Sequence, residues 1–485
     1  MKATTRRLTL VMVGFVLALF LMLNWTMVVR AGYWNSQPNN LRTTLEVFNR
    51  DRGQLLVGDE SIAQSDEVSG RYKYQRVYPD AEYYSHMQGW FSLIYGTGGL
   101  ENTENDFLAG TDPRVAFSSL ESILEGGNRS GGNVKTTINA AAQQAAIKGL
   151  GSNRGAVAAI DPRTGAILAL ASSPGYDPNL ISSQDSEESR RAWEDYQEDD
   201  QKPMLYRTIR ETYNPGSTFK VVTTSAALAN GYSLDSQIPA QERYQIPGSD
   251  AFISNASSDG NCRGAVNGLI TIEQALIVSC NTAFAELAVT LGESALREAA
   301  EAYGIDDEGY TIPLAVVAST VGDIPGDAEL AQSGIGLRDV RLTALQNALV
   351  AAAVANDGVQ MRPYLIDEYL DQEDAVVDRT RPVTWRRSTS PSIAADLTQA
   401  MVGVVQGGTG TNGAVPGVTV AGKTGTGPVP DNASNAWFIS FAPADDPQIA
   451  VGVVVENVGS GGSNAAPISS RVMQAYFNSV QGGEG

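Results

Sequence analysis

The sequence predicts an α+β fold: one antiparallel five-stranded sheet flanked by helices, joined to a smaller mixed N-terminal domain and one transmembrane helix. Three observations lead to this prediction. Strand patterns occur at both ends of the region after residue 132, and helical patterns fill the space between them. An apolar run lies near the N-terminus. One antiparallel sheet covered by helices is the simplest fold that pairs such distant strands.

The five strand candidates fall into two groups. Residues 155–171 contain two aliphatic runs joined by Asp161-Pro162-Arg163-Thr164-Gly165, which is typical of a hairpin turn. The second group comprises residues 418–426, 436–442 and 449–456. Apolar residues at helical spacing predict helices at residues 137–150, 217–229, 271–288, 295–303, 343–355, 392–405 and 467–480.

The N-terminus predicts a signal anchor. Lys2, Arg6 and Arg7 precede an apolar run at residues 8–29, which is long enough to cross a bilayer. Because cations flank a span on its cytoplasmic side, residues 1–7 are predicted to be a cytoplasmic tail, and the rest of the chain to lie outside the cell membrane. A cleaved signal peptide is the alternative, but the run is long for one and lacks a clean small-x-small cleavage site.

Composition indicates the domain boundaries and excludes two classes of function. A smaller stalk domain is predicted at residues 30–132, ending in a glycine-rich stretch, and a larger domain at residues 133–485. The chain has 54 acidic and 34 basic residues, a net charge of −20, which argues against a nucleic-acid partner. The single histidine, His86, excludes a zinc site with several imidazole ligands, and no metal is predicted.

The stretch Asn214-Pro215-Gly216-Ser217-Thr218-Phe219-Lys220 is the first candidate for chemistry. If it opens a helix, Ser217 and Lys220 share one face, and the helix N-terminus favours the negative charge that develops when a serine attacks a carbonyl. With only one, distant histidine, a lysine of lowered pKa is the remaining base for such a serine. Alone, the pattern is weak, since Ser-x-x-Lys is common at ordinary helix starts.

Two further motifs strengthen the interpretation of Ser217 and Lys220 as catalytic residues. Ser279-Cys280-Asn281 falls within the helix predicted at residues 271–288, and Lys423-Thr424-Gly425-Thr426 falls on a strand candidate. In this order, the three motifs resemble the signature set of penicillin-binding proteins and serine β-lactamases, over about residues 136–480. The resemblance implies their transpeptidase-domain fold and a serine D,D-transpeptidase that needs no cofactor.

The resemblance also implies catalytic roles. Ser217 would attack the D-Ala-D-Ala end of a peptidoglycan stem peptide, Lys220 would accept its proton, and Ser279 would relay that proton to the leaving group. Asn281 would hold the substrate amide. The ordinary alternatives are a Ser279 hydroxyl that bonds back within its helix and a buried, satisfied Asn281.

The strand motif would bind the substrate carboxylate. Lys423 would supply positive charge, and Thr424 and Thr426 would supply hydroxyls, although Thr424 alone also suits any strand. Gly425 would let the substrate backbone approach closely. The backbone N–H groups of Ser217 and Thr426 would form the oxyanion hole.

The rest of the chain resembles one subgroup of penicillin-binding proteins. The single span and a stalk with Gly99-Leu100-Glu101 and Asn105-Asp106 resemble class B penicillin-binding proteins. The segment from Phe48 to Leu55 and the Ser-Cys-Asn form are most similar to the actinobacterial penicillin-binding protein A group. The resemblance implies several partners: the donor and acceptor stem peptides, β-lactam antibiotics, the cytoplasmic membrane, a polymerising glycosyltransferase and division proteins.

Three points stay open in the sequence. Cys262 and Cys280 can pair if the domain is exported. The stretch from Gly407 to Gly413 is predicted to be a flexible turn, because no lysine follows at the spacing of a phosphate-binding loop. A D,D-carboxypeptidase, a β-lactam sensor and a division scaffold are alternative functions. A β-lactamase would need a base, and Asp327-Ala328-Glu329-Leu330-Ala331 only faintly resembles the loop that provides one.

Overall fold

The central sheet has the five predicted antiparallel strands. The computed structural model describes residues 2–30, 48–116, 131–257, 260–429 and 433–482. The sheet order is β19-β20-β21-β7-β8, with bounds β19 (Ala421–Pro428), β20 (Ser434–Ala442), β21 (Ile449–Val455), β7 (Gly155–Ile160) and β8 (Ile167–Ser173). Strands from both ends of the region therefore meet in one sheet, which confirms the predicted fold class.

Helices cover both faces of this sheet. One face packs against α9 (Ala140–Leu150) and α21 (Ala466–Gly482). The other packs against α18 (Ala344–Ala355), beyond which lie α13 (Lys220–Ala229) and α19 (Pro391–Gly407). Because both faces are covered, β7, β8 and β21 are buried throughout, and their sequences are apolar runs rather than alternating patterns.

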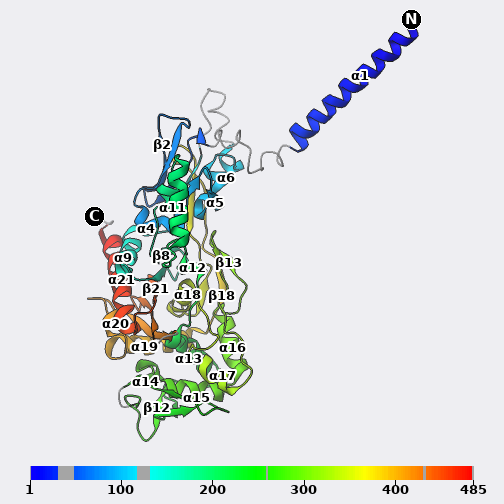
Figure 1. The fold of residues 1–485 in the computed structure, drawn as a ribbon. Coiled ribbons are helices and arrows are strands. Elements are labelled where there is room, and N and C mark those ends of the chain that lie inside the picture. The colour runs from blue at the N-terminus through cyan, green and yellow to red at the C-terminus, as the bar shows by residue number, and fades with distance from the viewer. Residues whose placement is uncertain (1, 31–47, 117–130, 258–259, 430–432, 483–485) are drawn as a thin grey trace.

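The molecule beyond residue 48 is elongated, with the stalk at one end and α14 and α15 at the other (Figure 1). The remaining helices are α4 (Ala81–Gln88), α5 (Gly99–Thr103), α6 (Asn105–Leu108), α7 (Pro113–Ala116), α10 (Pro178–Ile181), α11 (Ser186–Glu198), α12 (Arg207–Arg210), α14 (Ile272–Ile277), α15 (Asn281–Leu291), α16 (Glu293–Ala302), α17 (Asp327–Ser333) and α20 (Gly461–Asn464). Short two-stranded pairings are formed by β4 (Phe91–Ser92), β5 (Gly96–Thr97), β9 (Gln237–Pro239), β10 (Arg243–Gln245), β11 (Phe252–Ser254), β12 (Leu269–Thr271), β13 (Tyr310–Thr311), β14 (Ala315–Val316), β15 (Val359–Met361) and β18 (Thr384–Arg387).

The prediction of one helix at residues 271–288 is wrong. The chain forms α14 and α15 with a break at Val278-Ser279-Cys280. Ser279 adopts a left-handed backbone conformation with φ 60°, which no α-helix accommodates. The side-chain oxygen of Asn255 then accepts hydrogen bonds from the first N–H groups of α15, those of Asn281 and Thr282 (2.9 and 3.1 Å). A remote residue thus stabilises a second helix start that local spacing does not reveal.

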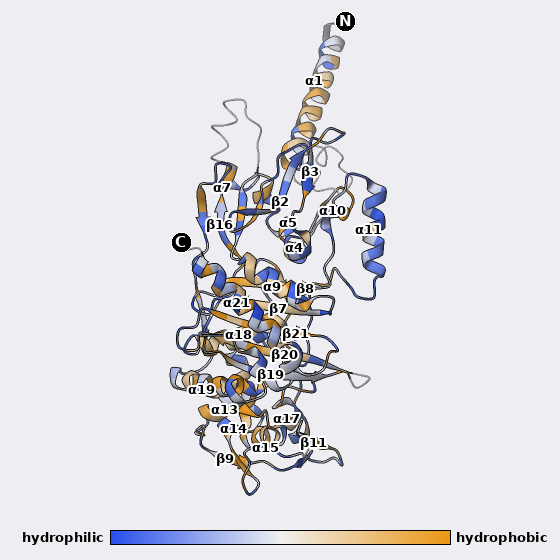
Figure 2. Cartoon of the chain, turned by 90° about the vertical axis from the view of Figure 1, so that its left-hand side faces the viewer, coloured by the Kyte–Doolittle hydropathy of each residue, from blue (hydrophilic) through white to orange (hydrophobic). Residues whose placement is uncertain are grey.

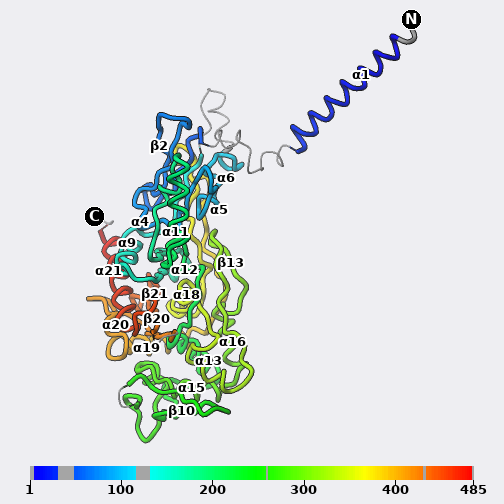
Figure 3. The backbone as a smooth tube through the Cα atoms, in the orientation of Figure 1, coloured from blue at the N-terminus to red at the C-terminus, as the bar shows by residue number. Residues whose placement is uncertain are grey.

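The stalk sheet combines three distant segments of the chain. Its order is β17-β16-β6-β1-β2-β3, with bounds β17 (Val376–Arg379), β16 (Ile366–Leu370), β6 (Asn133–Thr136), β1 (Leu55–Val57), β2 (Glu60–Glu67) and β3 (Tyr74–Val77). In Figure 3, the yellow segment that contains β16 and β17 rises among the blue strands of the stalk. The sheet therefore crosses the boundary predicted between residues 132 and 133.

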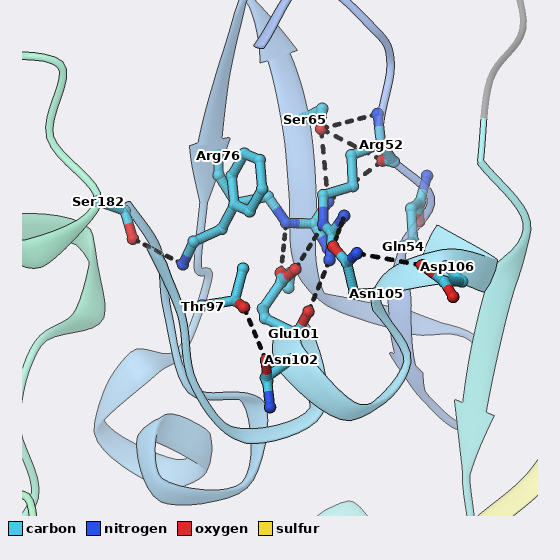
Figure 4. Close-up of polar contacts among 12 residues, drawn as sticks. Arg52, Gln54, Ser65, Arg76, Thr97, Glu101, Asn102, Asn105, Asp106 and Ser182 are labelled. Carbon is cyan, nitrogen blue, oxygen red and sulfur yellow. Dashed lines mark hydrogen bonds and ion pairs between the residues drawn. The ribbon is translucent and has the colours of Figure 1, made fainter. Parts of the chain in front are cut away.

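A buried ion triad fixes the stalk around Glu101 (Figure 4). The two oxygens of Glu101 accept hydrogen bonds from Nε of Arg52 and Nε of Arg76, each at 2.6 Å. All three side chains are at most 3% exposed. Arg52 also donates to the Glu101 carbonyl (2.7 Å) and to Asn105 Oδ1 (3.1 Å). The triad ties the segment before β1, strand β3 and helix α5 together.

The N-terminal helix is long and apolar enough to span a membrane. Helix α1 (Lys2–Asn24) continues into a π-helical turn (Trp25–Val29). Within residues 5–29, an 18-residue stretch has a mean hydropathy of 2.3, and its side chains are not buried in the structure. Figure 2 shows apolar residues along α1, in contrast to the hydrophilic α11.

Candidate active site

Ser217 and Lys220 lie on one side of a tight turn. The chain enters through a 3₁₀ helix, η2 (Gly216–Phe219), and α13 begins at Lys220. A 3₁₀ helix has three residues per turn, so residues three apart project in the same direction. Phe219, Val221 and Val222 on the opposite side are at most 1% exposed and pack into the helical core. This packing fixes the direction of both functional side chains.

Strand β19 packs directly against this turn. Gly216 has φ +53°, and a Cβ there would lie 2.3 Å from the carbonyl oxygen of Thr426. A Cβ on Gly425 would lie 2.4 Å from the carbonyl oxygen of Pro215. Gly425 is therefore required by backbone packing, whatever its contact with substrate. Since β19 is an edge strand, every second residue presents its N–H and C=O away from β20.

The break between α14 and α15 presents Ser279 to the cavity. A serine in the left-handed region costs about 1–3 kcal/mol, which the surrounding contacts must offset. Cys280 forms a disulfide with Cys262, with Cα atoms 5.5 Å apart. Its side chain is 2% exposed and belongs to the helical core, so it lies away from the cavity. The disulfide and the Asn255 cap hold the break from both sides.

Two buried amines contact the Ser279 hydroxyl. Lys423 Nζ donates to Ser279 Oγ at 2.9 Å, and Lys220 Nζ lies 3.4 Å from the same oxygen. Lys220 Nζ also donates to the Ser279 carbonyl oxygen (2.9 Å) and to Asn281 Oδ1 (2.7 Å). A neutral amine has two hydrogens, so these two acceptors engage both and leave its lone pair for a hydroxyl proton.

Burial changes the ionisation of both lysines. Neither side chain is exposed. Burial lowers the pKa of Lys220 well below its ordinary value, and the positive charge of Lys423 lowers it further. Burial also lowers the pKa of Lys423, to about 7. The arrangement can therefore provide a neutral base at Lys220 together with a partly charged amine at Lys423.

A cavity of about 380 Å³ joins the three motifs. It is lined by Ser217, Ala256, Val278, Ser279, Asn281, Ile335, Leu337, Thr409, Asn412, Thr424, Gly425, Thr426, Ser460, Gly461, Gly462 and Ser463. Among the described residues, none of those lining it is acidic, and no group of three or more His, Cys, Asp or Glu side chains is placed to hold a metal. Glu329, in the segment that faintly resembles the base-providing loop of a β-lactamase, lies in helix α17 and accepts a hydrogen bond from Arg338 (2.5 Å).

The structure brings every predicted site residue to this place. Six of them line the cavity, and Lys220 and Lys423 lie buried beside it. Asn281 is engaged at both ends of its side chain, since its Nδ2 donates to the Ser254 carbonyl (2.9 Å) while its Oδ1 accepts from Lys220.

Sequence reasoning missed other parts of the site. The ring of Phe284 lies 5.5 Å from Lys220 Nζ, and Ser460 to Ser463 form one wall of the cavity. Asn255 and Thr409 were also missed. Phe284 follows the Ser-x-Asn motif by one turn of α15, a spacing that could have indicated it. Asn255 and Thr409 lie in loops, and Ser460 to Ser463 lie at the start of the short helix α20, where none of them carries a local signal.

Comparison with known proteins identifies the family of both parts of the chain. Residues 155–474 match the family model for the penicillin-binding protein transpeptidase domain, and residues 52–134 match that for the penicillin-binding protein A dimerisation domain. The chain is 41% identical to peptidoglycan D,D-transpeptidase PbpA of Mycolicibacterium smegmatis, over 98% of this chain and 99% of that protein. It is 40% identical to PbpA of Mycobacterium tuberculosis, with the same coverage.

Solved structures agree with these relatives. The ceftriaxone acyl-enzyme complex of penicillin-binding protein A from M. tuberculosis is similar with a TM-score of 0.86 and 41% identity, covering 89% of this chain and 99% of that chain. The penicillin G acyl-enzyme complex of the same protein gives a TM-score of 0.84 and 41% identity, covering 88% of this chain and 100% of that chain. The chain therefore belongs to the penicillin-binding protein transpeptidase family, as a class B penicillin-binding protein of the A type.

Proposed function

We propose that this chain is a peptidoglycan D,D-transpeptidase that acts through an acyl-enzyme on Ser217. Ser217 Oγ forms a bond to the carbonyl carbon of the penultimate D-alanine of a stem peptide, and the bond to the terminal D-alanine breaks. An amine of a second stem peptide then takes the acyl group and frees the serine. The observation that carries the proposal is the meeting of Ser217, Lys220, Ser279 and Lys423 at one cavity.

Proton transfer follows from the contacts of the two lysines. Lys220, whose pKa is lowered by burial and by Lys423, takes the proton of Ser217 as the bond to the substrate forms. The Ser279 hydroxyl lies within 3.4 Å of Lys220 Nζ and within 2.9 Å of Lys423 Nζ. It relays the proton to the amine of the departing D-alanine, which leaves as a neutral amino group.

Substrate binding uses the edge of β19. An extended peptide can add alongside this strand through main-chain hydrogen bonds, with its amide held by Asn281 and its carboxylate by Lys423, Thr424 and Thr426. The N–H groups of Ser217 and Thr426 receive the developing oxyanion. The proximity of Gly216 to the Thr426 carbonyl supports this role, because it brings the two backbones together.

The second half of the reaction favours an amine over water. Hydrolysis of the acyl-enzyme at a useful rate needs a base beside the attacking water, as in a β-lactamase. Among the described residues, those that line the cavity include no carboxylate, and Glu329 is paired with Arg338. An incoming amine is a stronger nucleophile than water and depends less on such a base.

The same proposal covers location and partners. Lys2, Arg6 and Arg7 before the span support a cytoplasmic N-terminus and a catalytic domain outside the membrane, where peptidoglycan is built. Residues 1–7 then serve as the tail, residues 8–29 as the anchor, residues 30–132 as the stalk and residues 133–485 as the catalytic domain. Three strands of the catalytic domain, β6, β16 and β17, belong to the stalk sheet. β-Lactams acylate the same serine, and a polymerising glycosyltransferase and division proteins are proposed associates.

Covalent labelling tests the acyl-enzyme. The full-length chain in detergent is incubated with a fluorescent penicillin, and labelled protein is followed on a gel and by intact-protein mass spectrometry. Wild type should be labelled and release the label slowly, while Ser217→Ala should not be labelled. Ser233→Ala, at an exposed serine after α13, is the matched control and should be labelled as wild type. Labelling of Ser217→Ala would disprove the assignment of the nucleophile.

Product analysis tests the acceptor. A lipid-linked pentapeptide substrate is supplied with and without an acceptor amine, and the products are separated by mass. A cross-linked product supports the transpeptidase, whereas hydrolysed tetrapeptide alone would replace it with a D,D-carboxypeptidase.

A further inference from the structure

The glycine-rich turn before β19 is anchored from both sides of the cavity. Arg263 Nη2 donates to the Gly407 carbonyl at 2.5 Å, and a Cβ on Gly408 would lie 2.4 Å from the Ile277 carbonyl at the end of α14. On the opposite side, Asn412 Nδ2 donates to the Gly462 carbonyl at 2.9 Å. A Cβ on Gly462 would lie 2.4 Å from the carbonyl of Thr409. These contacts fix the position of Thr409 at the cavity.

Thr409 contacts the substrate-binding strand through a hydroxyl pair. Its Oγ1 lies 2.6 Å from Thr424 Oγ1, and both residues line the cavity. Each hydroxyl has a single hydrogen, so only one of the two can donate within the pair. If Thr424 donates to Thr409, it presents lone pairs to the cavity. If Thr409 donates to Thr424, the hydrogen of Thr424 stays available for a ligand.

The charge of the ligand decides between these arrangements. A carboxylate is only an acceptor, so it binds to Thr424 when Thr424 donates. Thr424 is 7% exposed and lines the cavity, so its hydroxyl, the one polar group of its side chain, can reach a ligand there. Donation from Thr409 also polarises the Thr424 hydroxyl, which strengthens the hydrogen bond that Thr424 donates to the ligand.

We propose that Thr409 is a positioning residue that donates to Thr424 and so directs the Thr424 hydrogen toward the substrate carboxylate. The proposal rests on the function given above, in which Thr424 binds that carboxylate. It makes Thr409 part of the selectivity for anionic ligands, through its effect on Thr424.

A ligand pair that differs only in charge tests this role. The second-order rate constant for acylation of full-length protein is measured with benzylpenicillin and with its methyl ester, which has no carboxylate. We expect Thr409→Val, which keeps the shape but removes the hydroxyl, to lower the ratio of the two constants about two- to tenfold, as for loss of one hydrogen bond between neutral groups, here the one from Thr409 to Thr424. Thr409→Ser should restore most of the ratio.

Control variants separate this role from a structural one. Thr411→Val makes the same change in the same turn, at a residue that does not line the cavity, and should leave the ratio as in wild type. An unchanged ratio in Thr409→Val, or equal slowing with both ligands, would overturn the proposal, as would failure of Thr409→Ser to restore the ratio. If wild type is not acylated at Ser217 by either ligand, the proposed function itself fails and this role fails with it.

Discussion

The pH dependence of the acylation rate should reflect the ionisation of Lys423. Burial lowers the pKa of this lysine to about 7, so its amine is charged below pH 7 and loses its charge as the pH rises through 7. The rate constant kcat/KM, or its equivalent for acylation by a β-lactam, reports pKa values of the free enzyme. Acylation by an anionic penicillin should therefore decline above pH 7.

The size of the decline follows from the charged fraction. With a pKa of about 7, about half of Lys423 is charged at pH 7 and about 1% at pH 9, which corresponds to a roughly 50-fold lower rate constant. A hydrogen bond to a charged group contributes about 1.5–3 kcal/mol, which limits the fall to between roughly 10- and 150-fold. Lys220 adds no decline as the pH rises, because a rise in pH can only increase the neutral fraction of a base. Protonation of Lys220, whose pKa is lowered by burial and by Lys423, should slow acylation at lower pH instead.

The comparison variant is Lys423→Arg. Arginine remains charged at all these pH values, so the decline above pH 7 should disappear, whatever the absolute rate. Acylation by benzylpenicillin is followed by intact-protein mass spectrometry from pH 5.5 to 9.5 at constant ionic strength. A flat wild-type profile from pH 6.5 to 9, or the same decline in Lys423→Arg, would refute the assignment of this pKa to Lys423.

Two further predictions concern stability, measured by denaturant unfolding. Burial lowers the pKa of His86 to about 4, so below about pH 6.5 the unfolded chain binds a proton that the folded protein does not bind. The free energy of unfolding should therefore fall by about 3 kcal/mol as the pH drops from 6.5 to 4. The variant His86→Gln should lack this part of the fall. Equal slopes in both proteins would contradict this origin. Glu101→Gln should lower the free energy of unfolding by about 3–5 kcal/mol, because Arg52 and Arg76 stay buried without their counter-charge. A loss below about 1 kcal/mol would mean that the triad does not hold the stalk.

Local patterns were enough to predict the central sheet and the catalytic turn. Strands β7, β8 and β21 are largely apolar runs because helices cover both faces of the sheet, and such runs are visible in the sequence. The spacing of Ser217 and Lys220 is also local, and the 3₁₀ turn aligns the pair even more closely than an α-helix does. The stalk sheet could not be predicted in this way, since β6 pairs with β16, which lies more than 200 residues later.

The position of Ser279 shows why the rest of the site needed the fold. Residues 272–288 have the apolar spacing of one helix, yet a serine inside it could not reach between two lysines from different elements. The left-handed conformation of Ser279 costs about 1–3 kcal/mol and is maintained only because Asn255 caps α15 and Cys262 holds Cys280. Both partners are remote in the sequence. The chemistry was therefore predictable from residue types, whereas the geometry that lets one hydroxyl contact two amines depends on contacts that only the folded chain provides.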